Sequence, residues 1–191
     1  KGIHRIRVNT LSGGSQSFVA TYLDFEKHQD SIHLCYFCDT QNEHPTTYDF
    51  IYKSLKVLSR DFPNVEAVMV WDVVCSKEPL EHLLGIKLQL TPITFGFGIF
   101  EPERLDYVKK SQPTAIAPLL EDERFFDKQK LNKFVEDLGL EIPYLYKIGM
   151  SHNNCGGFCV KAGQAHYKRL LEEDPELYMK HELHQERLID S

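Results

Sequence analysis

Long apolar runs are missing from this chain, since none of its 191 residues belong to a stretch approaching the roughly 20 that cross a bilayer. The N-terminus lacks the charged region followed by an apolar run that is typical of a secretion signal. Positive charge is also in deficit, with 22 Lys and Arg against 28 Asp and Glu. We therefore expect a cytoplasmic protein without membrane contact, in which any nucleic-acid contact is local because no overall basic field exists.

Cysteine content is far below that of a disulfide-rich secreted scaffold, with five residues in all. They are Cys35, Cys38, Cys75, Cys155 and Cys159. A chain of this length that is 42% hydrophobic builds a core without disulfides. The odd number and the two close spacings favour a reducing compartment and a metal or redox role over a secreted disulfide framework.

A glycine turn near the N-terminus organises the chain. An apolar run containing Ile6, Val8 and Leu11 predicts a buried strand, residues 12–15 read Ser-Gly-Gly-Ser, and residues 18–23 have helical apolar spacing. Glycines permit a sharp turn and leave the first amides of a helix open to an anion. A plain loop with a capping serine is the alternative for this motif alone.

Strand and helix patterns alternate after this turn. Residues 31–38 and 65–71 predict further buried strands, and residues 45–58 a helix that starts at a proline. Residues 80–84 suggest a short helix, residues 91–100 an edge strand or a covering loop, residues 114–120 a strand, and residues 131–138 a helix that Gly139 ends. The alternation predicts an α/β domain with a parallel sheet.

The chain from residue 164 onward is charged and helical, with a break at Pro175. We expect an α/β domain over residues 1–148, with a C-terminal cysteine loop and helices over residues 149–191 packed on it.

Polar residues follow the first two predicted strands, where the loops of an open α/β sheet meet around a ligand. Asp39 and Thr40 end the second strand, and Asn42 and Glu43 follow in a polar turn. We predict that they contact a nucleotide whose phosphates lie on residues 12–17. Capping of the next helix is the alternative for Asp39, Asn42 and Glu43 taken singly.

Three segments carry a resemblance to a known family. They are residues 12–17 (SGGSQS), residues 38–48 (CDTQNEHPTTY) and residues 152–164 (HNNCGGFCVKAGQ). In this order they resemble the phosphoadenosine phosphosulfate reductase family, which lies in the adenine nucleotide alpha hydrolase-like superfamily of PP-loop ATP pyrophosphatases. The resemblance covers most of residues 5–170 and implies a three-layer α/β sandwich with a mainly parallel five-stranded sheet.

The resemblance implies binding of ATP or an adenylyl sulfate, and adenylyl transfer, sulfur transfer or reduction, as in sulfur metabolism. The expected nucleotide contacts on the first loop are Ser12, Gly13, Gly14, Ser15, Gln16 and Ser17. Two departures bear on the reaction. Gln16 stands where the pyrophosphatases have an acid that assists magnesium, and the C-terminal cysteine motif of the reductases is absent. A sensor or subunit that binds the nucleotide without chemistry is therefore the alternative.

The third segment supplies the remaining expected catalytic residues beside Ser17, namely His152, Cys155, Cys159 and Lys161. Cys155 and Cys159 flank two glycines, so a folded-back loop presents both thiols to one zinc ion or iron–sulfur cluster, or to each other. Incidental cysteines, a hydrogen-bonding His152 and a surface Lys161 are the plainer alternatives. Protein partners, a homo-oligomer and nucleic acid contacting the basic residues after Lys161 also stay open.

Overall fold

The computed structural model describes residues 5–72, 81, 87–98, 101–153, 155–159 and 161–189. Its centre is a five-stranded sheet of order β3-β2-β1-β4-β5, in which all four strand pairs are parallel. The strands are β1 (Ile6–Thr10), β2 (Ile32–Cys38), β3 (Glu66–Asp72), β4 (Ile93–Thr94) and β5 (Ala115–Ile116). The predicted α/β fold with a parallel five-stranded sheet is confirmed.

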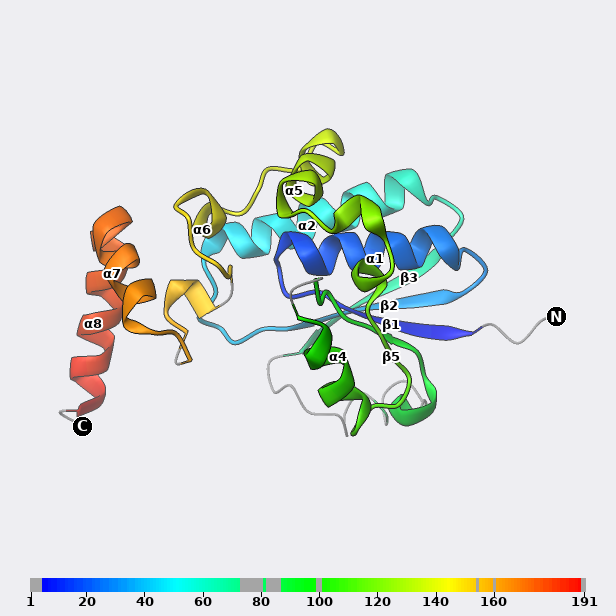
Figure 1. The fold of residues 1–191 in the computed structure, drawn as a ribbon, viewed down its shortest axis with the longest axis horizontal. Coiled ribbons are helices and arrows are strands. Elements are labelled where there is room, and N and C mark those ends of the chain that lie inside the picture. The colour runs from blue at the N-terminus through cyan, green and yellow to red at the C-terminus, as the bar shows by residue number, and fades with distance from the viewer. Residues whose placement is uncertain are drawn as a thin grey trace.

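Helices lie on both faces of this sheet (Figure 1). They are α1 (Ser15–Lys27), α2 (Pro45–Asp61), α4 (Pro102–Lys109), α5 (Lys128–Asp137), α6 (Tyr144–Lys147), α7 (Gln164–Glu173) and α8 (Pro175–Ile189). Figure 1 shows α1, α2 and α5 over one face and α4 over the other. Short 3-10 turns cover Leu88–Leu90, Pro118–Leu120, Glu123–Phe125 and Cys155–Gly157.

The order of the strands creates a switch point beside β1. The chain builds β1, β2 and β3 in one direction, then returns to place β4 on the other side of β1. Thr10 at the end of β1 pairs with Tyr36 of β2, and its hydroxyl donates to the carbonyl of Thr94 in β4 at 2.8 Å. Ligands of open α/β sheets bind at such a point.

Two apolar clusters hold the sheet between its helices. Alternate residues of β2 enter opposite clusters, because successive side chains of a strand point to opposite faces. Cys35 and Phe37 pack with α1, α2 and α5, whereas Leu34 packs with Val8 and Ile93 on the other face. The phosphate-loop candidate is thus anchored on a β1 buried on both faces.

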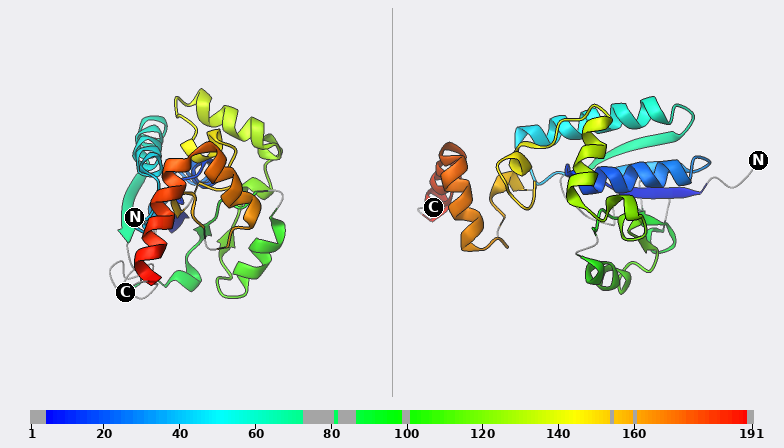
Figure 2. Two further views of the ribbon diagram at one scale, coloured as in Figure 1. Left: turned by 90° about the vertical axis from the view of Figure 1, so that its left-hand side faces the viewer. Right: turned by 45° about the horizontal axis from the view of Figure 1, so that its top comes forward.

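The C-terminal helices α7 and α8 form a hairpin beyond the carboxyl edge of the sheet, as Figure 2 shows. They meet at Pro175, where the sequence predicts the break. The described part of the chain contains no helix with the length and apolar character needed to cross a membrane.

Residues 91–98, the described part of the segment for which an edge strand or a covering loop was expected, contain an inner strand instead of an edge strand. β4 lies inside the sheet, between β1 and β5, and has only two residues. Helices α4 and α6 lack a clear apolar period in the sequence and were not predicted. The helix expected over residues 80–84 lies outside the described residues, apart from residue 81.

A buried ion pair braces β1 against α1 at the amino edge of the sheet. The Arg7 guanidinium binds the Asp24 carboxylate at 2.6 Å, and Asn9 Nδ2 donates to the same carboxylate at 2.7 Å. Burial raises the pKa of Asp24, but the hydrogen bonds from Arg7 and Asn9 and the charge of Arg7 outweigh it and hold the pKa below its usual value. The carboxylate is therefore ionised at neutral pH, and folding depends on its partner.

Replacing Arg7 with Met is expected to lower the free energy of unfolding by about 3–5 kcal/mol, because Asp24 is left as a buried charge without its cation. Lys133→Met is the matched control, since Lys133 forms an ion pair with Asp137 on the solvent-exposed face of α5. Urea unfolding at pH 7 measures both variants. Equal stability of the two variants would contradict the importance of the brace.

Candidate functional site

The turn between β1 and α1 presents an uncapped helix N-terminus at the switch point. Gly13 has φ 75°, a left-handed conformation that favours glycine. Gly14 is the N-cap of α1, and no side chain caps it with a hydrogen bond. The first amides of a helix have no partners within the helix, so this end of the thirteen-residue α1 offers donors and a positive dipole to an anion.

Hydroxyl groups inside the turn hold its shape. Ser17 Oγ donates to the carbonyl of Gly14 at 2.9 Å and accepts from the Ser12 amide at 3.1 Å. The Ser12 hydroxyl also donates to Ser17 Oγ at 3.1 Å. Ser17, which is predicted to contact the nucleotide, therefore holds the shape of the loop through these hydrogen bonds. Ser12 is exposed at the rim of the loop.

Ser15, the first residue of α1, differs from these serines. Its side chain is buried, and Ser15 Oγ has no hydrogen-bond partner. A buried hydroxyl without a partner is costly, because it has lost its water without replacement. A ligand at the helix N-terminus would supply the missing acceptor.

Tyr146 of α6 also reaches this turn, although no sequence motif singles it out. A Cβ added at Gly14 would lie 2.7 Å from the Tyr146 hydroxyl, so this hydroxyl sits directly against the glycine backbone. Burial, with a smaller effect of Glu101, raises the pKa of Tyr146 to about 12. The hydroxyl keeps its proton and is a donor throughout the neutral range. The sequence gives no sign of this role for Tyr146, because it is seen only in the close approach of the hydroxyl to Gly14.

Asn153 ties the third segment to the turn. Its amide Nδ2 donates to the carbonyl of Gly13 at 2.9 Å and to Thr47 Oγ1 at 3.1 Å. Thr47 returns a hydrogen bond to the carbonyl of Asn153 at 3.4 Å. Thr47 also limits the turn from the side, because a Cβ at Gly13 would lie 2.2 Å from Thr47 Cγ2. Asn153 thus joins the first loop, α2 and the C-terminal segment.

Asn153→Ala is expected to lower the free energy of unfolding by about 1–3 kcal/mol, because Gly13 O and Thr47 Oγ1 lose a buried donor. His152→Ala, a change at the exposed neighbouring residue, is the control and should leave stability unchanged. Urea unfolding followed by circular dichroism compares the two. A loss of similar size in both variants would show that the Asn153 amide does not hold the loop.

Asp39 stands at the end of β2, as expected, but protein donors occupy its carboxylate. Oδ1 accepts from the Gln41 amide at 2.7 Å and the Tyr48 hydroxyl at 2.9 Å, and Oδ2 accepts from Trp71 Nε1 at 3.0 Å. Burial raises the pKa of Asp39, but these three hydrogen bonds outweigh it and lower the pKa. Asp39 shapes the loop after β2, and its contact with a nucleotide stays a prediction.

Glu43 links this second loop to the cysteine loop. Thr40 Oγ1 donates to Oε1 at 2.8 Å, and the Cys155 amide donates to Oε2 at 2.8 Å. Burial raises the pKa of the Glu43 carboxyl above its usual value despite these donors. Asn42 is exposed, and its carbonyl lies against Gly156, where a Cβ would be 2.7 Å away. Thr40, Asn42 and Glu43 are thus gathered at the C-terminal segment.

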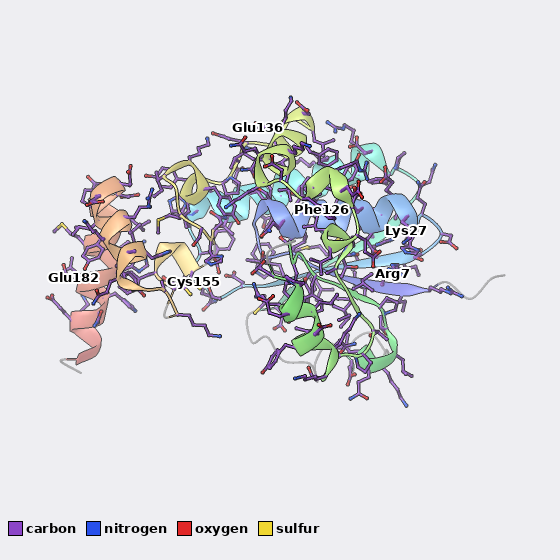
Figure 3. The ribbon with its side chains drawn as sticks, in the orientation of Figure 1. Arg7, Lys27, Phe126, Glu136, Cys155 and Glu182 are labelled. Carbon is purple, nitrogen blue, oxygen red and sulfur yellow. The ribbon has the colours of Figure 1, made fainter. Side chains whose placement is uncertain are left out.

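Cys155 and Cys159 face each other, and both are free thiols. The backbone of Cys155 is left-handed, with φ 56°. Burial raises the pKa of the Cys155 thiol, and the neighbouring Glu43 and Cys159 raise it further. The Cys155 and Cys159 side chains share a hydrogen bond. Figure 3 shows Cys155 between the carboxyl edge of the sheet and the hairpin of α7 and α8. Cys35 lies apart in the core, where burial raises its pKa to about 12.

The cysteine pair that is predicted to bind a metal lacks further ligands among the described residues. Among the described residues, no group of three or more His, Cys, Asp or Glu side chains is arranged to hold a metal ion. The two nearby histidines are engaged, His181 Nε2 with Gly156 O at 3.3 Å and His166 Nε2 with Gly157 O at 2.7 Å. Two thiols do not fill the four positions of a structural zinc site or a cluster, so we assign no reaction step to a metal.

The remaining predicted residues lie around the loop rather than within it. Gln16 packs its side-chain amide against Gly98, where a Cβ would lie 2.4 Å from Nε2. His152 is exposed, and Lys161 is exposed on a cavity beside α4.

A cavity of about 640 Å³ opens at the opposite end of α1, where Figure 3 shows Arg7 and Lys27. Arg7 and Arg124 in its wall already pair with Asp24 and Asp122. This cavity borders the C-terminal end of α1, whereas residues 12–17 lie at the N-terminal end of that helix, so we place the candidate site at residues 12–17.

No protein-family model matches the chain, and no curated protein matches it. Among solved structures, the chain is similar to the U34-tRNA thiolase NcsA from Methanococcus maripaludis with its 4Fe-4S cluster. The sequence identity is 15% and the TM-score 0.44, over 100% of this chain and 73% of that chain. A similarity of this degree carries no information about activity, so function must be argued from the motifs and the geometry of the site.

Proposed function

We propose that residues 12–17 bind the phosphate or sulfate end of an adenine nucleotide, ATP or an adenylyl sulfate. The observation that carries this proposal is the uncapped N-terminus of α1 at the switch point between β1 and β4. Amides at a helix N-terminus and its dipole favour an anion at this position. The buried, unpartnered hydroxyl of Ser15 adds a donor that lacks an acceptor within the protein.

The adenine nucleotide and the reaction class are proposed from the three sequence segments that resemble phosphoadenosine phosphosulfate reductases. Hydrogen bonds join these segments in space: Asn153 binds the Gly13 carbonyl, and Glu43 accepts from the Cys155 amide. The contacts support treating the segments as one site. We infer adenylyl transfer, sulfur transfer or reduction within that family as the chemistry.

The loop stabilises negative charge as it develops on the attacked phosphate or sulfate. Backbone amides that are fixed before the reaction do this without reorganisation, as in other phosphoryl-transfer sites. The protonated Tyr146 hydroxyl, held against Gly14, is a further donor. Magnesium has no assigned ligand here, because the loop position of the usual acid is the neutral Gln16, which packs on Gly98.

Ser15→Ala tests the proposal directly. We expect ATP or adenylyl sulfate affinity to fall about tenfold in calorimetric titrations, because a hydrogen bond to a charged oxygen is lost. The unliganded protein should be as stable as the original or more stable, since the change removes a buried hydroxyl without a partner.

Ser54→Ala is the matched control, because Ser54 Oγ is also buried without a partner but lies on α2. Its effect on stability should match that of Ser15→Ala, while nucleotide affinity stays unchanged. Equal nucleotide affinity in the two variants would overturn the assignment of the loop.

Gln16 favours a second candidate, a nucleotide-binding subunit without chemistry. Its amide brings no negative charge to the loop and is already packed on Gly98. Such a subunit would bind the nucleotide and release it unchanged.

Product analysis decides between the two candidates. With saturating nucleotide and a thiol reductant, an enzyme is expected to release pyrophosphate or AMP from ATP, or sulfite from the adenylyl sulfate. We expect turnover to stop in Gly13→Ala, because a Cβ at Gly13 would collide with Thr47. Gly139→Ala is the control with equal backbone strain, since Gly139 has φ 86° and open space around it. Tight binding without any product would instead establish the subunit.

A further inference from the structure

A second cavity lies one loop away from residues 12–17. It measures about 660 Å³ and is bounded by α4, by Phe97 after β4, and by Lys161 from the end of the cysteine loop. The loop after β4 touches the phosphate-loop candidate closely, because a Cβ at Gly96 would lie 2.6 Å from the Ser17 amide nitrogen. The cavity therefore borders the loop that packs on the phosphate-loop candidate.

Aromatic rings form part of its wall. Tyr107 on α4 is 75% exposed, and its ring faces solvent with a nearby cation. Phe97 is buried, stacks on Phe95 with ring centroids 5.2 Å apart, and carries the Arg104 guanidinium 4.8 Å from its centroid. One ring is thus fixed by its neighbours, and the other is open for stacking.

Cations lie beside these rings. Lys110 Nζ is 5.9 Å from the Tyr107 centroid, and Lys161 stands on the other wall. Both lysines are exposed, and neither forms an ion pair with any residue that the structure describes. Glu103 and Asp106 also line the cavity, so its field is weak overall. A ligand would gain more binding free energy from stacking on the rings than from the net charge of the cavity. Its phosphate groups would lie at the two lysines.

We propose that this cavity binds single-stranded nucleic acid, as a site separate from the nucleotide site proposed at residues 12–17. Single-strand sites combine exposed aromatic rings, on which bases stack, with separated cations that follow the backbone. The low charge of the cavity and the net charge of -6 for the chain disfavour duplex binding through a broad basic surface. Two phosphate contacts imply a salt slope of about −1.4 for a single strand.

The experiment measures the affinity of the full chain for a fluorescein-labelled oligouridylate of about 12 nucleotides by fluorescence anisotropy. The titration is repeated between about 50 and 200 mM KCl to obtain the dependence of affinity on salt. Tyr107→Ala should weaken binding roughly five- to hundredfold, the range for loss of one stacked base. Lys161→Gln should reduce the slope by about 0.7. The controls are Tyr52→Ala, which removes a ring that is 57% exposed on α2, and Lys130→Gln on α5, both on the face away from α4.

Unchanged affinity in Tyr107→Ala, or an equal loss in Tyr52→Ala, would overturn the proposal. So would absence of oligonucleotide binding at the lowest salt, or equal affinity for uridine monophosphate, which would indicate a mononucleotide site. ATP titrations of the same variants separate this inference from the proposed function. Tyr107→Ala should keep ATP affinity, and Ser15→Ala should keep oligonucleotide affinity.

Discussion

The contact between the Asn153 amide and the Gly13 carbonyl is the constraint on which the candidate site depends. Gly13 adopts a left-handed conformation, and its carbonyl is buried away from water. Without a donor this carbonyl would cost free energy, so the turn keeps its shape only while Asn153 is in place. The same side chain binds Thr47, which limits the turn from α2. One amide thus decides whether the amides of α1 stay open to an anion.

The two edges of the sheet differ in how their polar groups are paired. At the amino edge, Arg7 and Asp24 satisfy each other, and the brace leaves no unpaired charge. At the carboxyl edge, Ser15 lacks a partner, Cys155 has a left-handed backbone and two thiols face each other. The unpartnered Ser15 hydroxyl and the left-handed Cys155 backbone both lie where function is expected, and the stable scaffold around them compensates for their cost.

Local pattern was enough to predict β1, β2 and β3, the long helices and the parallel sheet, because burial on both faces leaves continuous apolar runs. It was also enough to predict residues 12–15 as the turn that leads into α1. The roles of residues inside the site could not be predicted from local pattern. The side chains of Ser17 and Asp39 form hydrogen bonds within the protein, and Tyr146 reaches Gly14 from α6. Such roles depend on which segments meet in space, and periodicity does not encode these meetings. The sequence suggested an edge strand or a covering loop over residues 91–100, not the two-residue inner strand β4, and it did not indicate α4, because both elements are too short to show a period.

The distance along the chain between Gly13 and Asn153 has a consequence for folding. These partners are 140 residues apart, so their hydrogen bond closes one of the longest loops in the protein. Contacts of such separation form late, since the entropy of loop closure must be met before they contribute. During synthesis the turn leaves the ribosome early but waits for the C-terminal segment to be completed. We therefore expect a nascent chain to complete the candidate turn at residues 12–17 last, after the sheet that carries it.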